Sequence, residues 1–380
     1  MTRGGNDRIV RGMPPRYLAE QVRADLRRGT VLLAGPVGVG KTTLARSIQR
    51  PGNAFLSWDV PAERESILRR ELPEAGPLVF DELPRYPSWL SYLRSLEEDR
   101  PGRHRVLATG SARSDRDPSG TEILGGMVRL LRLHPFSAAE VGARSGADLR
   151  DLLNLGGFPE PLFGGKEREA RLWSLSYRRR LAHDEAVGSE ADRAGLERLL
   201  ERLPGLVGEP LSVNALRADL GAGHKTVSRW LDLLEDLYAI ARLAPLCAPG
   251  LRAVRKARKH YHYDWTLVED PRKRFENLTA MHLLKQVHFL RDAQNRDVEL
   301  RFFRDVDGRE VDFVVVEDGR PRILVDARLE DEPLSRGLPY LLRRFPEAHA
   351  FQISAAGRWD RRTPEGVRVC PAAAFLRVLV

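Results

Sequence analysis

The residues best suited to chemistry form a glycine-rich run, Gly35-Pro36-Val37-Gly38-Val39-Gly40-Lys41-Thr42. It fits the pattern G-x-x-x-x-G-K-[ST], in which backbone N–H groups surround phosphate oxygens, lysine contacts the β- and γ-phosphates and the hydroxyl contacts Mg²⁺. An apolar run at 31–34 precedes it and a helical pattern at 43–48 follows it. A strand, a glycine loop and a helix N-terminus are the elements that phosphate binding needs. We therefore predict that Gly35 to Thr43 bind ATP.

Two carboxylates follow the next strongly apolar strand pattern. Asp81 and Glu82 come directly after the run 77–80, about 40 residues beyond the glycine loop. Alone, an apolar run ending in two acids commonly marks the end of a strand. After a phosphate loop it predicts the Walker B pattern, in which Asp81 holds Mg²⁺ and Glu82 orients and polarises the attacking water.

A third strand pattern, at 105–109, ends in Thr109-Gly110-Ser111. A hydroxyl at the tip of a strand beside the phosphate strand can contact the γ-phosphate, so we count Thr109 and Ser111 as catalytic candidates. A plain turn from strand to loop explains either residue equally well. The alternation of strands and helices up to about residue 140 predicts a parallel α/β sheet.

Residues 209–245 have the pattern of a helix-turn-helix followed by a wing. A short helix at 212–220 and a turn at 221–224 precede a longer amphipathic helix that starts near 225. Such a unit either binds DNA or serves as a lid between domains. A basic segment at 251–260 either contacts phosphates or is a solvated linker. The nucleic-acid candidates are Lys225, Thr226, Arg229, Arg255, Lys256, Arg258 and Lys259.

The last part of the chain places acids on a helix and on two neighbouring strands. Glu276 falls on the helix 275–288, Asp312 on the strand 309–316, and Asp326 and Arg328 on the returning strand 322–328. The pattern resembles the acidic Mg²⁺ site of PD-(D/E)XK nucleases, and it predicts a second metal site at Glu276, Asp312 and Asp326. Arginine replaces the expected lysine, which is not a conservative change. The alternative is a nuclease scaffold without chemistry, in which Arg328 pairs with the carboxylates.

Composition sets limits on location and partners. The 380 residues carry a net charge of +9 and two cysteines, Cys247 and Cys370. Neither a disulfide framework nor a cysteine metal site is expected, and no apolar run approaches the roughly 20 residues of a membrane span. The first residues lack the apolar core of a signal peptide. We therefore expect a cytoplasmic protein without a membrane partner. The arginine excess suits DNA, although biased codon usage explains it about equally well.

Taken together, these motifs resemble the prokaryotic AAA+-type P-loop ATPases that carry a C-terminal nuclease-like domain of undefined function. The likeness runs nearly end to end. It rests on the phosphate loop, on Asp81-Glu82 and on the segments 87–90, 109–111, 133–137, 157–161, 224–231, 274–277 and 309–313. The resemblance implies ATP binding, Mg²⁺ and DNA as the partner.

Three departures from that family matter. Leu83-Pro84 follows the Walker B acids in place of a glutamine, and Asp326-x-Arg328 replaces Glu-x-Lys. Gly126-Met127 replaces the Gly-Arg that precedes the His-Pro strand, with Arg129 and Arg132 nearby. The last difference leaves the source of an arginine finger open.

The sequence therefore predicts a three-part α/β chain. Residues 1–145 form a P-loop AAA+-type ATPase domain, 146–250 a helical and winged-helix domain, and 251–380 a PD-(D/E)XK nuclease-like domain. The predicted function is a Mg²⁺-dependent ATPase that binds and remodels DNA, branched or structured DNA included. One alternative is an ATP-driven nuclease, and another is a nucleotide-gated switch that binds protein. A homo-oligomer is left open.

Overall fold

The computed structural model describes residues 14–49, 54–73, 76–99, 104–111, 122–123, 128–183, 189–247, 251 and 257–380. The chain divides into two compact units. The first contains residues up to 134 together with 236–238 and 291–295, and the second contains the remainder. Each unit is described by itself.

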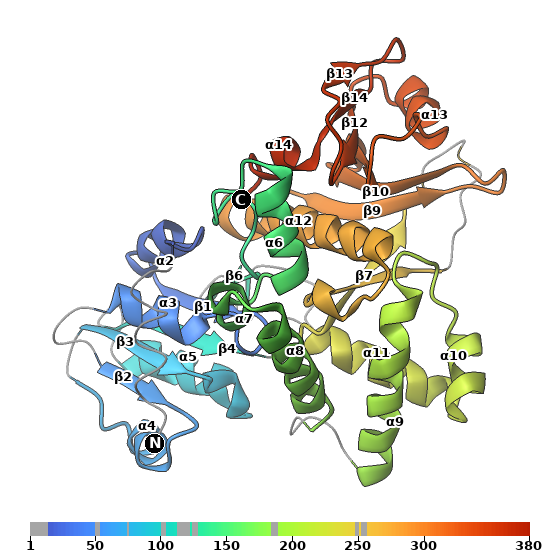
Figure 1. The fold of residues 1–380 in the computed structure, drawn as a ribbon. Helices are drawn as coiled ribbons and strands as arrows, with labels where there is room; N and C mark the ends of the chain where they lie inside the picture. The colour runs from blue at the N-terminus through green and yellow to red at the C-terminus, as the bar shows by residue number, and fades with distance from the viewer. Residues whose placement is uncertain are drawn as a thin grey trace. The chain divides into compact units, whose positions relative to one another are not determined.

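The first unit is built on a six-stranded sheet in the order β2-β3-β4-β1-β6-β5 (Figure 1). All neighbours pair in parallel except β5, which is antiparallel to β6. The strands are β1 Thr30–Ala34, β2 Ala54–Ser57, β3 Gly76–Asp81, β4 His104–Gly110, β5 Glu122–Ile123 and β6 Val128–Arg132. This confirms the predicted parallel α/β sheet.

The strand order brings three motifs to one edge of the sheet. Strand β4 lies between β1 and β3, and the carboxyl ends of parallel strands meet at the same edge. The phosphate loop, the Walker B acids and Ser111 therefore converge although they are far apart in the sequence. Residues 31–34 of β1 are fully buried, as expected for a central strand of a parallel sheet. The helices of this unit are α2 Ala19–Leu26, α3 Lys41–Ile48, α4 Pro61–Arg69, η1 Leu83–Arg85 and α5 Trp89–Asp99.

The second unit begins with a series of helices whose starts follow from local sequence. Ser145 and Asp148 form a capping box at the start of α6, and Ser189 and Ser212 cap α9 and α10 with their hydroxyls. Proline at the first turn of α7 suits the start of a helix. The helices are α6 Gly146–Leu155, α7 Pro159–Gly164, α8 Glu167–Ala182, α9 Glu190–Arg202, η2 Leu203–Leu206, α10 Val213–Leu220 and α11 His224–Asp236.

The rest of the second unit surrounds an eight-stranded sheet in the order β13-β14-β12-β11-β10-β9-β7-β8. Its strands are β7 Ile240–Pro245, β8 Lys259–His262, β9 Val298–Arg304, β10 Glu310–Glu317, β11 Arg320–Arg328, β12 His349–Ser354, β13 Arg361–Arg362 and β14 Arg368–Pro371. The remaining helical elements are η3 Trp265–Leu267, α12 Pro271–Gln294, α13 Gly337–Arg344 and α14 Ala372–Leu376.

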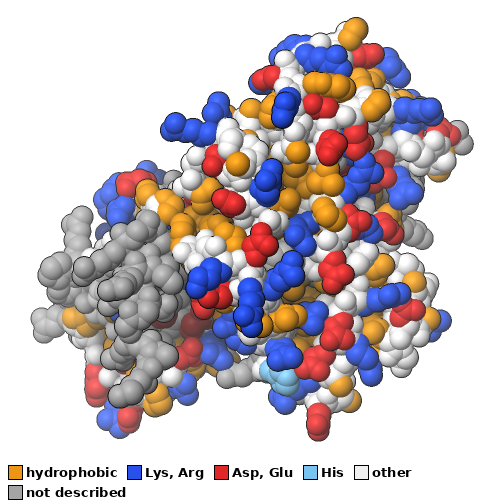
Figure 2. Space-filling view, viewed as in Figure 1, with side chains coloured by type: hydrophobic (Ala, Val, Ile, Leu, Met, Phe, Trp, Pro, Cys, Tyr) orange, Lys and Arg blue, Asp and Glu red, His pale blue; other side chains and the backbone are white. Residues whose placement is uncertain are grey.

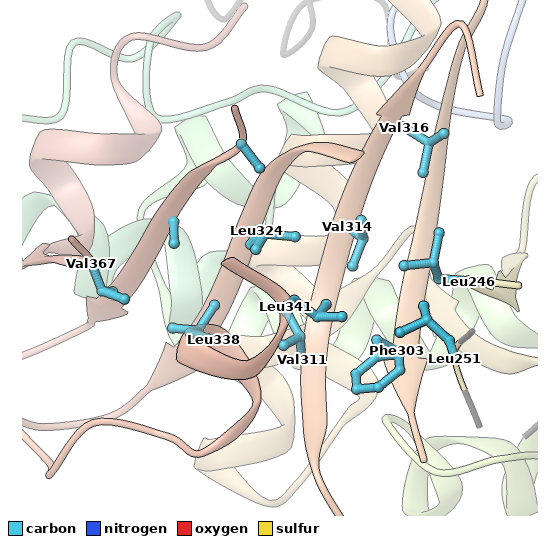
Figure 3. Packing of buried hydrophobic residues seen from close by; sticks show 12 residues of the cluster. Leu246, Leu251, Phe303, Val311, Val314, Val316, Leu324, Leu338, Leu341 and Val367 are labelled. Atoms are coloured by element: carbon cyan, nitrogen blue, oxygen red, sulfur yellow. The ribbon is translucent and has the colours of Figure 1, made fainter. Parts of the chain in front are cut away.

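One hydrophobic cluster holds this sheet to α13 (Figure 3). Leu338 and Leu341 of α13 are buried against apolar side chains of β10, β11 and β12. Gly337 is needed at the start of the helix, because a Cβ there would lie 1.9 Å from the carbonyl oxygen of Glu310. The predicted hairpin of the last domain is confirmed, since β10 and β11 pair antiparallel with Phe313 opposite Val325.

The expected boundary near residue 250 falls between β7 and β8. These two strands pair with each other, and β7 also pairs in parallel with β9. The hairpin that follows α10 and α11 is thus part of the eight-stranded sheet, and one unit holds what the sequence divides into a middle and a last domain. In the described ranges, none of the helices combines the length and apolarity that crossing a membrane requires.

Candidate nucleotide site

The phosphate loop follows β1 with a backbone that glycine makes possible. Gly35 has φ +154°, and a Cβ there would lie 2.3 Å from the carbonyl oxygen of Leu133. Gly38 and Gly40 have φ +81° and +99°, a region that side chains disfavour. Gly40 is the N-cap of α3, so the loop leads directly into a helix N-terminus. This combination of close backbone and helix dipole suits a polyphosphate.

Lys41 is held inside this loop. Its side chain is 4% exposed, and its Nζ donates to the carbonyl oxygens of Gly35 at 3.0 Å and Pro36 at 3.1 Å. It also donates to Ser111 Oγ at 3.3 Å and lies 3.6 Å from the Glu82 carboxylate. Burial lowers the pKa of the Lys41 ammonium, while the carboxylate of Glu82 works in the opposite direction.

Asp81 joins three segments of the sheet edge. Thr42 Oγ1 donates to it at 2.9 Å, and Thr109 Oγ1 donates to it at 2.6 Å. Burial raises the pKa of Asp81, and the hydrogen bonds from Thr109 and Thr42 oppose the rise. A hydroxyl and a carboxylate oxygen side by side are ligands that Mg²⁺ accepts. The Thr42–Asp81 pair therefore fits the predicted metal position.

Glu82 is the second acid of the edge. It has φ +55°, an uncommon conformation for a residue other than glycine. Ser111 Oγ and the Ser111 backbone N–H donate to its carboxylate at 2.5 Å and 3.1 Å. Its own backbone N–H donates to Thr109 Oγ1 at 3.1 Å.

The two hydroxyls proposed from sequence thus have different surroundings. Thr109 is fully buried, and its hydroxyl bonds to the Asp81 carboxylate and to the backbone N–H of Glu82, whereas Ser111 connects Lys41 to the Glu82 carboxylate. The structure brings together Lys41, Thr42, Asp81, Glu82, Thr109 and Ser111. These residues fit a magnesium-bound nucleoside triphosphate.

Neither arginine near the missing Gly-Arg motif is unpaired. Arg132 is 8% exposed and donates from Nε and Nη2 to the carboxylate of Asp292. Asp292 lies in the last turn of α12, and residues 291–295 belong to the first unit. Arg129 lies 3.3 Å from Asp25. Both guanidinium groups therefore have structural carboxylate partners. Gly126 and Met127 lie outside the described residues.

The nucleic-acid candidates on α11 lie at its exposed start. Lys225 is exposed and Thr226 partly so. Arg229 donates to Asp192 of α9. Further along α11, Asp232 and Glu235 accept hydrogen bonds from Arg242 of β7, so these acids are paired within the fold.

Of the basic segment 251–260, the structure describes its last part. Arg258 is exposed, whereas Arg255 and Lys256 lie outside the described residues. Lys259 corrects a prediction. It is 1% exposed, so it is not available to a DNA phosphate, and it lies instead among the carboxylates of the predicted second metal site. The whole of β8 is buried, which its mixture of lysine, histidine and tyrosine did not indicate.

The acids of the last domain do come together, but with cations between them. Lys259 Nζ lies 2.5 Å from Glu310 and 3.5 Å from Glu276. Arg328 lies 3.3 Å from Asp312 and 3.4 Å from Asp326. Arg328 thus makes the carboxylate contacts that the alternative without chemistry predicts.

Burial and mutual repulsion dominate the pKa values of this cluster. Burial, reinforced by the charge of Asp312, raises the pKa of Asp326 to about 7 and also raises the pKa of Glu276. Burial by itself would lower the pKa of Lys259, but the carboxylates of Glu276, Asp312 and Glu310 outweigh it and raise that pKa. Within the described ranges, no three His, Cys, Asp or Glu residues are arranged to hold a metal ion. Among the described residues, Glu276, Asp312 and Asp326 are thus paired with two internal cations and are not grouped as metal ligands.

Comparison with known proteins agrees with the geometry of the first unit. Residues 27–142 match a family model described as an AAA domain, which supports an AAA+ ATPase. Residues 146–270 match a model described as a domain of unknown function, DUF8612. Uncharacterized proteins of Mycobacterium bovis and Mycobacterium tuberculosis are each 27% identical over 371 residues, covering 89% of this chain and 81% of theirs.

Solved structures give weaker likenesses. The ORC1 protein of Aeropyrum pernix, in complex with DNA, is 15% identical over 68% of this chain and 93% of its own, with a TM-score of 0.34. A signal transduction ATPase with numerous domains and a tetratricopeptide repeat sensor, from Pyrococcus horikoshii, is 13% identical over 74% of this chain and 49% of its own, with a TM-score of 0.24. Both scores are too low to carry an argument.

Asp81→Asn should leave the nucleotide-free protein at least as stable as the parent at neutral pH. Because the folded-state pKa of Asp81 is raised, its ionised form costs stability as the pH rises above the unfolded value. An amide of the same shape removes that cost, so the melting temperature should rise. The gain should grow between pH 4 and pH 7 in thermal melts. A loss of stability that is equal at both pH values would contradict the raised pKa.

Lys259→Met should destabilise the second unit by about 3 kcal/mol, because it removes the buried cation that Glu276 and Glu310 share. Since the folded-state pKa of Lys259 is raised, its stabilisation should be complete through neutral pH and should be lost only in strong alkali. Urea unfolding measures the effect. The matched control is Lys273→Met, which breaks the ion pair with Glu209, an exposed residue, and should cost below about 1 kcal/mol. Equal losses in the two variants would remove the structural role of Lys259.

Proposed function

We propose that this protein is a Mg²⁺-dependent ATPase that couples ATP hydrolysis to the binding and remodelling of DNA. The observation that carries the ATPase part is the continuous contact among Lys41, Ser111 and Glu82 beside the Thr42–Asp81 pair. A phosphate-binding cation, a metal-binding pair and a carboxylate for water activation are thereby held at one edge of one sheet.

Each residue then has a separate task. The backbone of Gly35 to Thr43 and the Lys41 ammonium bind the phosphates. Thr42 and Asp81 hold Mg²⁺, which when bound neutralises charge on the phosphates. Glu82 orients the attacking water and accepts its proton. Thr109 fixes Asp81 and the backbone of Glu82, and is a positioning residue.

Ser111 accepts a hydrogen bond from Lys41 and donates one to Glu82. It can therefore couple the binding of phosphate by Lys41 to the position of the Glu82 carboxylate. The Lys41 ammonium contacts carbonyl oxygens of its own loop, and these contacts are ones that phosphate oxygens can replace. A change in the position of Lys41 would therefore alter the hydrogen bonding of Ser111 and, through it, the orientation of Glu82.

DNA as the partner is supported by charge and by the helix pair. The chain carries a net charge of +9, and Lys225 is exposed at the start of α11, the second helix of the α10–α11 pair. Arg258, at the base of β8, adds an exposed cation to the same unit. The hairpin β7–β8 follows the two helices, in the order of a winged helix.

The two alternatives differ in how well the structure supports them. An ATP-driven nuclease is disfavoured, because Lys259 and Arg328 occupy the carboxylates that would bind its metal. Divalent-metal-dependent DNA cleavage that disappears in Asp312→Ala would restore it. A nucleotide-gated switch that binds protein would leave ATP turnover insensitive to DNA.

Glu82→Gln should bind ATP with nearly unchanged affinity yet hydrolyse it about 100- to 1,000-fold more slowly, because only proton acceptance is lost. Lys41→Ala should instead lose tight nucleotide binding, because it removes the ammonium that the loop carbonyls hold in place for the phosphates. Fluorescent-nucleotide titration and single-turnover phosphate release separate the two effects. Parental turnover in Glu82→Gln would exclude Glu82 as the group that activates water.

Lys225→Glu combined with Arg258→Glu should weaken duplex DNA binding and reduce the salt slope by about 2, since each phosphate contact contributes roughly 0.9. DNA stimulation of ATP turnover should fall in parallel, while turnover without DNA stays at the parental rate. The control is Arg27→Glu with Arg94→Glu, two exposed arginines of the first unit with the same change in charge. A flat salt response of the parent, with no stimulation by DNA, would favour the protein-binding switch.

A further inference from the structure

The end of the second unit carries a group of exposed cations around one aromatic side chain. Residues 336–380 contain eight arginines and three acidic residues, a net charge of +5. The whole chain has a net charge of +9, so more than half of it lies in this short segment. Figure 2 shows blue side chains on the part of the molecule that carries β13 and β14 in Figure 1. We call Arg343, Trp359, Arg361, Arg362 and Arg368 the arginine–tryptophan surface.

The aromatic member of this surface is unusually exposed. Trp359 is 38% exposed, whereas the other five tryptophans of the chain are buried or partly buried. Arg361 lies over its ring, with the guanidinium carbon 4.3 Å from the ring centroid. A tryptophan that remains accessible beside a cation offers a stacking face next to a charge for a phosphate.

Two of the arginines come from different strands but line up, whereas Arg361 points to the other face of the short edge strand β13, on the side of Trp359. Arg362 of β13 is opposite Arg368 of β14, which in turn is beside Phe351 of β12. Residues in one cross-strand row lie on the same face of a sheet. Arg368 is paired with Asp360. Within the described part of the chain, Arg343, Arg361 and Arg362 form no ion pair, so their charges are available to a ligand.

A cavity of about 440 Å³ opens beside this row. Three arginines, Arg343, Arg362 and Arg368, line it together with His349 and the two carboxylates of Glu347 and Glu365, so its cations outnumber its acids. Leu342, Ala348 and Phe351 contribute apolar groups. Apolar groups rimmed by cations suit a planar, weakly polar ring attached to an anionic chain. That is the chemistry of a nucleotide unit in a strand whose bases are not paired.

We propose that the arginine–tryptophan surface binds single-stranded DNA, with one base stacked on Trp359, another base in the cavity and the intervening phosphates on Arg361 and Arg362. Exposed charges on a short edge strand also protect a sheet from pairing with other sheets. That protection requires neither an exposed tryptophan nor a cavity with an apolar lining. Duplex DNA offers no unpaired base to stack, so the surface should prefer single strands.

This inference rests on the proposed action on DNA, but it is tested without ATP. Binding of a fluorescent oligothymidylate to the full chain is followed by anisotropy, with quenching of tryptophan emission as a second signal. Trp359→Ala should weaken binding about tenfold. Trp359→Phe should retain most of the affinity yet lose most of the quenching. Phenylalanine keeps an aromatic ring on which a base can stack, but it lacks the tryptophan emission.

Arg361→Glu with Arg362→Glu should weaken binding and reduce the salt slope by about 1.4, since each single-strand phosphate contact contributes roughly 0.7. The matched control is Arg193→Glu with Arg198→Glu on α9, exposed arginines of the same unit with the same change in charge. Parental affinity in the control supports the surface, and equal weakening in both pairs overturns it. Equal affinity for duplex and single strand, or binding to RNA alone, would also overturn it.

The outcome is independent of hydrolysis. Glu82→Gln should bind the oligonucleotide like the parent, because Glu82 lies in the first unit at the nucleotide site. If ATP turnover proves insensitive to DNA while the surface binds single strands, the proposed coupling of hydrolysis to DNA is wrong. The proposal that the arginine–tryptophan surface binds single-stranded DNA is then retained. If turnover responds to DNA but Trp359→Ala binds like the parent, the surface is wrong and the coupling stands.

Discussion

The hydrogen bonds to Asp81 are the interaction on which the nucleotide site depends. One carboxylate accepts from Thr42, at the start of α3, and from Thr109, at the end of β4. Because β4 lies between β1 and β3, Thr109 is the residue that can join the acid of one neighbour to the loop of the other. The strand order thereby fixes the distance between the phosphate loop and the Walker B acids. Removing either hydroxyl would leave this largely buried carboxylate with one side-chain donor in place of two, which is costly.

Much of this arrangement could be predicted from the sequence because the motifs are local. Two motifs have a conformation that neighbouring residues determine. They are the glycine loop between an apolar run and a helix, and the apolar run that ends in Asp81-Glu82. What local pattern did not supply was the difference between Thr109 and Ser111. Both lie at the end of β4, but Thr109 is buried and donates to Asp81. Ser111 instead contacts Lys41 and Glu82. That difference depends on which strands flank β4.

The sequence was least informative for Lys259. In a run of arginines and lysines it has the composition of a solvated segment, and only the pairing of β8 with β7 places it inside the second unit. Asp312 and Asp326 were easier to associate, because a hairpin brings neighbouring strands together by local geometry. A cation arriving from a strand more than 50 residues away in the sequence has no local signal. The same limit applies to Arg362 and Arg368, which share a row only through the pairing of β13 with β14.

The two acidic groups of this chain show why similar carboxylates need not have similar functions. Asp81 accepts hydrogen bonds from hydroxyl groups. A hydroxyl oxygen and a carboxylate oxygen can both bind the same metal ion. Asp312 and Glu310 are satisfied by Arg328 and Lys259, whose charges a metal would have to displace against their attraction to the carboxylates. Burial raises the pKa values of Asp81 and Asp326 alike, so burial does not separate the two groups. The hydrogen-bonding partner determines whether a carboxylate can bind a metal. Neutral donors leave the carboxylate able to bind Mg²⁺, whereas fixed cations compete with the metal for it.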